Sequence, residues 1–351
     1  MTRHYASHRD SAQNLAAATL WHITGPFRIV RLLGPQYLLR CAVFHHIADA
    51  ESSFTRGLGV TTTRRNFEAA LKFLTKYYTP VSLQDIVADG DGRTLPPRPL
   101  LVTFDDAYAS IAEFAAPLCR NYGVPAVLFT NAAYLDNEQL ALDNLICHAV
   151  NVLGLDRINA VANASSGIKE MKLRSMAQIF AQFLPAISLQ ARTTFRHVLT
   201  ELVETSEHDL AAKAGLYLTR KQLRELAANG LEIGNHTYTH VHCRSLGQEN
   251  FFQEIDRNKA ELEAASGRRV RSFSLPYGSA ADLTIDVARH LRLSGHEVVF
   301  LSESVANSRD SGGFQFDRVS LSANSNHLLF FEIEVLPRLR AIRNRLSRTR
   351  T

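Results

Sequence analysis

Two adjacent carboxylates and a spaced pair of histidines are the side chains of this sequence best suited to chemistry. Asp105 and Asp106 directly follow the apolar run PLLVTF. His236 and His240 belong to H-T-Y-T-H, and this i, i+4 spacing puts both imidazoles on one face if the segment turns helical. Two imidazoles and one carboxylate can bind a divalent metal and leave positions open for water and substrate. The pattern therefore predicts a candidate metal site.

Each half of this pattern also has a plainer explanation. Consecutive residues of a regular strand point to opposite faces, so the two aspartates can share a pocket only where the chain turns. One of them could instead cap the next helix, AYASIAEF. Thr237 replaces the glutamate of H-E-x-x-H, and two histidines without a carboxylate partner are usually unliganded. His242 and Cys243 follow closely and offer further ligand atoms, which leaves the ligand set open.

Two other polar clusters also follow apolar runs. Pro276-Tyr277-Gly278 reads as a turn, or as a loop whose backbone N–H groups point at a developing oxyanion. His45 and His46 end the run LLRCAVFHHI, where either could be a core histidine or could orient a metal ligand.

The apolar runs that carry these residues are predicted strands separated by amphipathic helices. This alternation indicates an α/β fold with a parallel sheet and crossover helices, either open or closed as a barrel. Such folds place their sites at the carboxyl ends of the strands, where the polar residues described above lie. The predicted strands lie within residues 38–47, 99–106, 124–135, 231–240, 270–278, 296–302 and 316–322.

The segment 136–215 is rich in Ala and Leu and shows only helical patterns, so it is predicted to be a helical insertion. It could be a lid, a substrate-selecting subdomain or a dimer surface. Residues 1–36 are predicted to be an N-terminal helical preamble, and 326–351 a basic C-terminal helix or tail. The remaining 37–325 then form one barrel domain that contains the insertion.

The composition places the chain among globular proteins. Of its 351 residues, 46% are hydrophobic and 21% charged, which excludes a disordered chain, a collagen-like repeat and a disulfide scaffold. No uninterrupted apolar run reaches the roughly 18 residues of a membrane span. Four cysteines without a C-x-x-C pair favour free thiols in a reducing compartment. The weakly apolar start, NLAAATLWHI, is expected to be a helix and not a signal peptide.

The net charge of +5 is concentrated in the C-terminal stretch PRLRAIRNRLSRTRT, which contains no acid. Such a stretch can contact anionic lipid, nucleic acid or an acidic partner. It can equally be a solvated helix end whose arginines complement the helix dipole. Because the rest of the chain is close to neutral, a nucleic-acid-binding protein is disfavoured. We expect a cytoplasmic protein, with peripheral contact to the inner membrane face through this Arg-rich end as one possibility.

Three motifs occur in an order that resembles the polysaccharide deacetylases, the NodB-homology group of carbohydrate esterase family 4. T-F-D-D at 103–106 matches the first motif of that family, and H-T-Y-T-H at 236–240 matches the second. F-S-L-P-Y-G at 273–278 resembles the third. The similarity covers about residues 38–134 and 216–322, and the first two motifs together are fairly specific.

The resemblance implies a distorted (β/α) barrel and a divalent metal, with zinc favoured. Carried over to this sequence, Asp106, His236 and His240 bind the metal, and Asp105 is the general base that activates water. The backbone N–H of Tyr277 would help the metal to stabilise the oxyanion. The reaction would release acetate and leave an amino sugar.

The chain departs from the family pattern in four places. Ala107 stands where the family has a glycine after the first motif, and Ser274 stands where it has the arginine that orients the base. Arg271 is near but off register. The family's Asp-and-Trp motif has no match. Its late Leu-x-x-His motif, which supplies the general acid, is not evident, because His296 and His327 have poor contexts; His45 is the alternative acid or orienting partner.

The leading interpretation is a metal-dependent enzyme that deacetylates an N-acetylated glycan or a glycolipid precursor. One alternative is a catalytically weak or inactive protein of this fold that binds glycans or belongs to a biosynthetic complex. Another is a different amide or ester hydrolase with the same metal site. The expected partner is a carbohydrate substrate, and the sequence does not indicate the oligomeric state.

Overall fold

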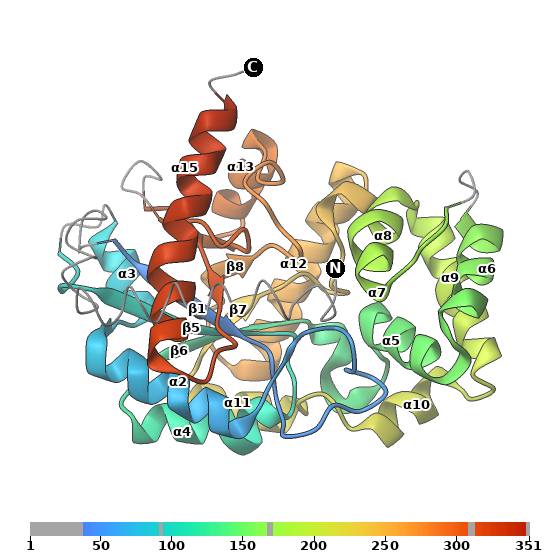
Figure 1. Ribbon diagram of the computed structural model, residues 1–351, viewed down its shortest axis with the longest axis horizontal. Helices are drawn as coiled ribbons and strands as arrows, with labels where there is room; N and C mark the ends of the chain where they lie inside the picture. Colours follow the sequence, from blue (N-terminus) through green and yellow to red (C-terminus); the bar gives the residue numbers. More distant parts are fainter. Residues whose placement is uncertain (1–37, 91–93, 167–170, 308–312, 349–351) are drawn as a thin grey trace.

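The computed structural model describes residues 38–90, 94–166, 171–307 and 313–348. Its centre is a nine-stranded parallel sheet with the order β10-β9-β8-β7-β6-β5-β1-β11, in which β4 also pairs with β5 (Figure 1). A separate pair joins β2 (His46–Ile47) to β3 (Thr61–Thr62). The strands of the sheet are β1 (Arg40–Phe44), β4 (Thr79–Pro80), β5 (Pro99–Asp105), β6 (Ala126–Thr130), β7 (Glu232–Asn235), β8 (Ser272–Ser274), β9 (Val298–Leu301), β10 (Gln315–Asp317) and β11 (Val319–Ser320).

The two edge strands of this sheet are consecutive in sequence. β10 pairs with β9 at one edge, and β11 pairs with β1 at the other. Only Arg318 separates these two strands, so the chain crosses from one edge to the other within one residue. The sheet is therefore a nearly closed barrel, which confirms the predicted fold class.

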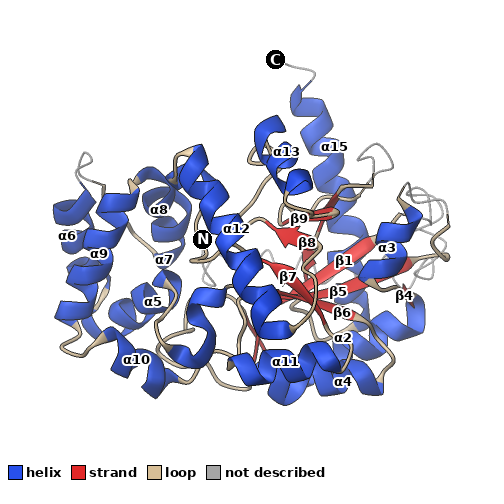
Figure 2. Ribbon diagram, turned by 180° about the vertical axis from the view of Figure 1, so that it is seen from behind, coloured by secondary structure: helices blue, strands red, loops and turns tan. Residues whose placement is uncertain are grey.

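The central strands are buried on both faces, as their unbroken apolar runs predict. In β5, Leu100, Val102 and Phe104 belong to a core that also includes side chains of the outer helices. Leu101 belongs to a second cluster, with Phe129 of the neighbouring β6 and Phe300 of the more distant β9. Helices cover the outside of the barrel (Figure 2), namely α2 (Arg64–Tyr77), α3 (Leu83–Asp89), α4 (Ala116–Asn121), α11 (Arg220–Ala228), α12 (Gln248–Ser266) and α13 (Ile285–Leu293).

Within residues 136–166 and 171–215 the structure has helices and no strand. They form a lobe beside the barrel, drawn in green and yellow in Figure 1. The helices α5, α6 and α9 pack on one another. The elements of the lobe are α5 (Leu142–Leu153), α6 (Leu155–Ser166), α7 (Met176–Gln178), η3 (Ile179–Phe183), α8 (Leu184–Ala186), α9 (Leu189–Leu202) and α10 (Glu207–Ala214).

The C-terminal segment is helical from Asn326 to Arg348, through α14 (Asn326–Phe330), the π-helical turn η6 (Phe331–Val335) and α15 (Leu336–Arg348). The predicted preamble lies outside the described residues, and the predicted domain boundaries stay a prediction. Within the described ranges, no helix combines the length and apolar character needed to cross a bilayer. The remaining short turns are η1 (Ile111–Ala115), η2 (Ala132–Asn137) and η4 (Cys243–Ser245).

Candidate active site

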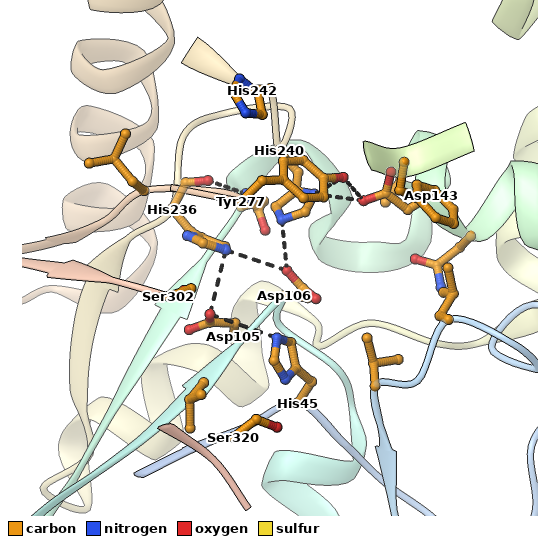
Figure 3. A pocket seen from close by; sticks show the side chains of 18 of the residues that line it. His45, Asp105, Asp106, Asp143, His236, His240, His242, Tyr277, Ser302 and Ser320 are labelled. Carbon is orange, nitrogen blue, oxygen red and sulfur yellow. Dashed lines mark hydrogen bonds and ion pairs between the residues drawn. The ribbon is translucent and has the colours of Figure 1, made fainter. Parts of the chain in front are cut away.

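The carboxyl ends of the barrel strands border a cavity of about 600 Å³. It lies where parallel barrels place their sites. The close view in Figure 3 shows three imidazoles and two carboxylates around a common centre, those of His45, His236, His240, Asp105 and Asp106. The structure brings together the six residues that were assigned a catalytic or metal-binding role from the sequence, His45, Asp105, Asp106, His236, His240 and Tyr277.

The two aspartates reach the same cavity because the chain turns between them. Asp105 is the last residue of β5, while Asp106 and Ala107 adopt positive φ angles of 71° and 55°. This left-handed backbone is easier for glycine, so Ala107 keeps the turn at some cost in strain. The alternative role as helix caps does not occur, because Ser110 precedes the next helical turn, η1.

Asp105 is held by Arg318, whose side chain is fully buried. Nη1 and Nη2 of Arg318 each donate to one carboxylate oxygen of Asp105, both at 2.7 Å. Burial alone would raise the pKa of Asp105, but the charges of Arg318, His236 and His45 outweigh it and hold this pKa well below its usual range. Asp105 is therefore an ionised carboxylate in a fixed orientation.

Arg318 also contacts Ser274, the residue that stands at the arginine position of the third motif. Its Nη2 donates to Ser274 Oγ at 2.7 Å, so the guanidinium lies against the small residue at the motif position. Arg271, the nearby candidate, instead lies 3.8 Å from Glu297. Arg318 was not predicted as a site residue; the available signal was an arginine inside the predicted last strand, FDRVS.

The two histidines of H-T-Y-T-H converge without forming a helix. The segment is a turn in which Thr237 and His240 have positive φ angles, and the two imidazole centroids are 5.0 Å apart. His236 Nδ1 lies 2.7 Å from the carbonyl oxygen of Ser274, so this nitrogen carries the proton and donates. The helical condition of the sequence argument is thus not met, although both rings enter the cavity.

The second histidine is oriented by a residue that sequence analysis did not single out. His240 Nδ1 lies 2.8 Å from Asp143 Oδ2, and a carboxylate can only accept, so Nδ1 donates. Asp143 lies on α5 of the helical lobe. The Tyr277 hydroxyl donates to the same oxygen, and this contact also ties the third motif to the lobe. No spacing pattern in the sequence linked Asp143 to the site.

Asp106 and the two imidazoles form a donor set that fits a divalent cation. Nε2 of His236 and Nε2 of His240 lie 3.6 and 3.3 Å from Asp106 Oδ1. That carboxylate oxygen is buried and has no hydrogen-bond partner. The three potential ligand atoms, one each from Asp106, His236 and His240, lie within 4.8 Å of one another. Because both Nδ1 atoms donate elsewhere, both Nε2 lone pairs are available, as in zinc sites with two histidines and one carboxylate.

The environment favours neutral His236. Burial lowers the pKa of His236 to about 4, although the nearby carboxylates oppose this effect. For His240, burial also lowers the pKa, but Asp106 and Asp143 outweigh it and the net shift is upward. Metal binding would displace the proton that this excess of negative charge attracts.

The remaining candidates named from the sequence, several histidines and Cys243, lie either at the cavity or away from it. His45 Nε2 lies 3.8 Å from Asp105 Oδ2, the same carboxylate oxygen that faces His236 Nε2 at 3.7 Å (Figure 3). His242 also lines the cavity and stacks on Tyr277. Four other candidates do not line it: His46, Cys243, His296 and His327.

A second cluster of possible ligands, His242, Cys243 and Asp282, is already engaged within the chain. Arg244 Nε donates to one carboxylate oxygen of Asp282 at 2.5 Å, and the backbone N–H of Ser279 donates to the other at 2.8 Å. The carboxylate thus acts as a structural acceptor in a loop.

The helical lobe contributes an apolar wall to the cavity. Ala177, Phe180, Ala181 and Pro185 line it opposite the barrel strands. The lobe therefore forms part of the cavity wall, and its role as a lid, a substrate-selecting subdomain or a dimer surface stays a prediction.

Comparisons with solved structures identify other proteins of the same fold. Solved structures with the same fold include the deacetylase PplD of Streptococcus pyogenes (TM-score 0.55, 13% identity, 85% of this chain and 98% of that one). IcaB from Ammonifex degensii has a TM-score of 0.51 at 18% identity, over 85% of this chain and 97% of that one. The de-N-acetylase of Aggregatibacter actinomycetemcomitans has a TM-score of 0.51 at 16% identity, over 82% and 96%.

Sequence comparisons point the same way. YxkH of Bacillus subtilis is 26% identical over 106 residues, which are 30% of this chain and 37% of the relative. YlxY of the same organism is 31% identical over 65 residues, 18% of this chain and 20% of the relative. The chain thus matches well under half the length of these curated relatives. The polysaccharide deacetylase profile matches residues 92–296, which include the paired aspartates, the histidine turn and the Pro-Tyr-Gly loop. With more than half of its length matched by that profile, the chain belongs to the polysaccharide deacetylase family.

Proposed function

We propose that this protein removes N-acetyl groups from an N-acetylated glycan or a glycolipid precursor in a reaction that depends on a divalent metal. One observation carries the proposal: Asp106 and the Nε2 atoms of His236 and His240 converge beside Asp105, which Arg318 holds ionised. This arrangement pairs an available donor set with an adjacent, separate base, and hydrolysis of an amide needs both.

Each residue has a distinct part in the proposed reaction. A divalent cation held by Asp106, His236 and His240 would act as a Lewis acid on the acetamide carbonyl and lower the pKa of the attacking water. Asp105 accepts the proton of that water, and its bidentate contact with Arg318 fixes the direction in which it accepts. The backbone N–H of Tyr277 would donate to the oxyanion.

His45 is the candidate general acid. Its Nε2 is 3.8 Å from Asp105 Oδ2, so His45 lies beside the proposed base at the reacting end of the cavity. The leaving amine must gain a proton when the C–N bond breaks, and an imidazole at this position can supply it.

The cavity is compatible with a substrate that is not a bare sugar chain. Its wall combines the polar residues described above with apolar side chains from the lobe and from Leu58 and Val60. A glycolipid precursor would offer a sugar to the first set and an apolar group to the second.

The test combines metal analysis with an assay of acetate release. We would measure bound zinc by mass spectrometry, and acetate released from chitopentaose and from an isoprenoid-linked N-acetylglucosamine. We expect Asp105→Asn to lower acetate release by about 10²–10⁴-fold, the range for loss of a general base. Asp256→Asn, at a half-exposed carboxylate on α12, is the matched control and should leave release unchanged.

Three outcomes would contradict the proposal. The first is a protein that binds no divalent metal after incubation with zinc. The second is acetate release that Asp105→Asn leaves unchanged. The third is a wild-type protein that releases no acetate from either substrate, which would favour a glycan-binding role. Ammonia in place of acetate would instead indicate an amidase that acts on a primary amide.

A further inference from the structure

Two helices carry most of the exposed large apolar side chains in the described part of the chain. Of the eight such residues, five lie on α13 and α15. Isolated exposed apolar residues are ordinary, but a concentration of them on neighbouring elements marks an interaction site. The five are 54–81% exposed and comprise Ile285, Leu293, Leu339, Ile342 and Leu346.

On each helix these residues form a stripe along one face. On α15, Leu339, Ile342 and Leu346 follow the i, i+3, i+7 spacing of a single helix face. On α13, Ile285 and Leu293 are eight residues apart, and the buried face of that helix holds Val287 and Leu291. The exposed stripe of α13 is therefore separate from the stripe that packs on the barrel.

The same faces are basic. The segment LPRLRAIRNRLSR of α15 contains five arginines and no acid. Arg338 is engaged by the buried Glu334, whereas Arg343 is exposed one position after Ile342. On α13, Arg289 is exposed between Ile285 and Leu293, and Arg292 is exposed as well. Asp286 is the one acid on α13. Apolar side chains flanked by arginines are typical of helices that lie in the headgroup region of an anionic bilayer.

The two helices lie at the same side of the molecule. In Figures 1 and 2, α13 and α15 are neighbours and extend past the barrel, on the side away from α10 and α11. The loop at 302–307 contacts both the segment before α13 and the start of α15. Ala280 N–H, before α13, donates to the Glu303 carboxylate at 2.8 Å, and Ala306 N–H donates to Pro337 O of α15 at 3.2 Å. We call the exposed faces of α13 and α15 the basic apolar face. Its residues are Ile285, Arg289, Arg292, Leu293, Leu339, Ile342, Arg343 and Leu346.

We propose that the basic apolar face docks the protein on the surface of an anionic phospholipid bilayer. The apolar stripes would enter the boundary between headgroups and acyl chains, while the arginines contact lipid phosphates. A nucleic acid fits less well because it offers no apolar phase for Ile285, Leu293 and Ile342. A second copy of this chain fits less well because a two-fold contact would bring the arginines of both copies together.

This placement is independent of the deacetylase proposal but complements it. Ser302, at the start of the bridging loop, lines the cavity, and the other end of that loop contacts α15. A docked protein would therefore hold the rim of the cavity on the lipid side of the molecule.

Co-sedimentation with unilamellar vesicles tests the proposal with the full chain. We expect the protein to sediment with vesicles of equal parts phosphatidylglycerol and phosphatidylcholine, and to stay in solution with phosphatidylcholine alone. Binding should weaken as salt rises, since exposed charge interactions are screened within about 8 Å at physiological ionic strength.

Two double variants separate the apolar and the electrostatic contributions. Leu293→Gln with Ile342→Gln, and Arg289→Glu with Arg343→Glu, should each lower the vesicle partition coefficient by about tenfold or more. The matched controls are Val152→Gln with Leu189→Gln, at exposed apolar residues of the lobe, and Lys72→Glu with Lys221→Glu, at exposed lysines elsewhere. Both controls should bind as the wild type does.

Three results would overturn the proposal. Equal binding to both vesicle types would exclude charge recognition, and equal losses in the controls would exclude this face. Sedimentation velocity showing a wild-type dimer that Leu293→Gln with Ile342→Gln dissociates, without vesicle binding, would assign the face to a second copy. Release of acetate from soluble chitopentaose should be unchanged in all four variants, so failure here is distinguishable from failure of the proposed function.

Discussion

Two buried arginine–carboxylate pairs lie at opposite ends of the central strands. At the carboxyl end of β5, Arg318 holds Asp105 through two contacts of 2.7 Å. At the amino end of the neighbouring β1, Arg40 holds Glu334 through contacts of 2.8 and 3.1 Å. Both pairs join the barrel to late segments of the chain, and both are nearly inaccessible to solvent.

Their surroundings differ. Asp105 Oδ2 also faces His45 and His236 at 3.8 and 3.7 Å, within the cavity. Glu334 is instead shared with a second arginine, Arg338, of the same helical segment. One carboxylate is thus held firmly but left open to a reacting group, and the other is fully used by structure. The same arginine–carboxylate pairing can therefore serve a reaction only where the carboxylate also faces a cavity.

Among the variants that test this comparison, removal of Arg318 should have the largest effect. In Arg318→Ala, Asp105 loses its fixed direction, and we expect acetate release to fall by about a hundredfold, as for a misplaced catalytic group. The unpaired buried carboxylate should also cost about 3–5 kcal/mol of unfolding free energy. Acetate release and thermal unfolding would measure the two effects.

A swap variant distinguishes orientation of the base from simple destabilisation. Adding Ser274→Arg to Arg318→Ala restores a guanidinium from the position that the family resemblance assigns to arginine. We expect part of the lost activity to return. If the variant with both changes folds as the wild type does but stays as slow as Arg318→Ala, positioning of Asp105 by arginine is the wrong explanation.

Breaking the other pair should affect stability alone. In Glu334→Gln, Arg40 and Arg338 lose their shared counter-charge, which should cost about 3 kcal/mol of unfolding free energy. Acetate release and zinc affinity below the unfolding transition should match the wild type. A selective loss of activity in this variant would contradict the distinction between the two pairs, because it would show that the Arg40–Glu334 pair also affects the active site.

The pH dependence of the same variant has a defined sign. Burial would raise the pKa of Glu334, but Arg40 and Arg338 outweigh it and the net shift is below the ordinary value of 4.5. A lowered native pKa stabilises the folded state above the unfolded value, and this contribution is lost as pH falls through the native pKa. The stability gap between wild type and Glu334→Gln should therefore be constant near neutrality and narrow below about pH 4.5. A gap that widens in acid would contradict the assignment.

The sequence predicted the strands and the six cavity residues because those signals are local. The runs ending at Asp105 and at His236 carry their polar residues at the strand ends, and parallel pairing brings such ends together. H-T-Y-T-H was interpretable by spacing, although the turn reaches the same convergence through positive φ angles and not through a helix.

The supporting residues were not predictable in this way. Arg318 is 213 positions from Asp105, and Asp143 is 97 positions from His240. Their contacts depend on barrel closure and on how the lobe packs on the barrel, and neither is encoded in a local period. The one hint was energetic: an arginine within a segment predicted to be a buried strand requires a partner.

Substitution of Asp143 should have the smallest of the expected effects. Its role is intermediate between those of the two pairs, because it supports a site residue without facing the reacting group as Asp105 does. It is a mostly buried carboxylate, 14% exposed, that receives donors from His240 and Tyr277, and it contacts the metal-ligand candidates through His240. In Asp143→Asn, the side chain loses its charge and holds the Nδ1–H of His240 less firmly. We expect zinc affinity, measured by competition with a chromophoric chelator, to fall by about 10–100-fold.

The control for this variant is Asp156→Asn, at an exposed carboxylate of the neighbouring helix α6, which should leave zinc affinity unchanged. Unchanged affinity in Asp143→Asn as well would show that the lobe only shapes the cavity. A loss confined to Asp143→Asn would show that the lobe also sets the strength of the metal site. Because the readout is affinity and not turnover, it separates orientation of His240 from any effect on Asp105, whose arginine partner is untouched.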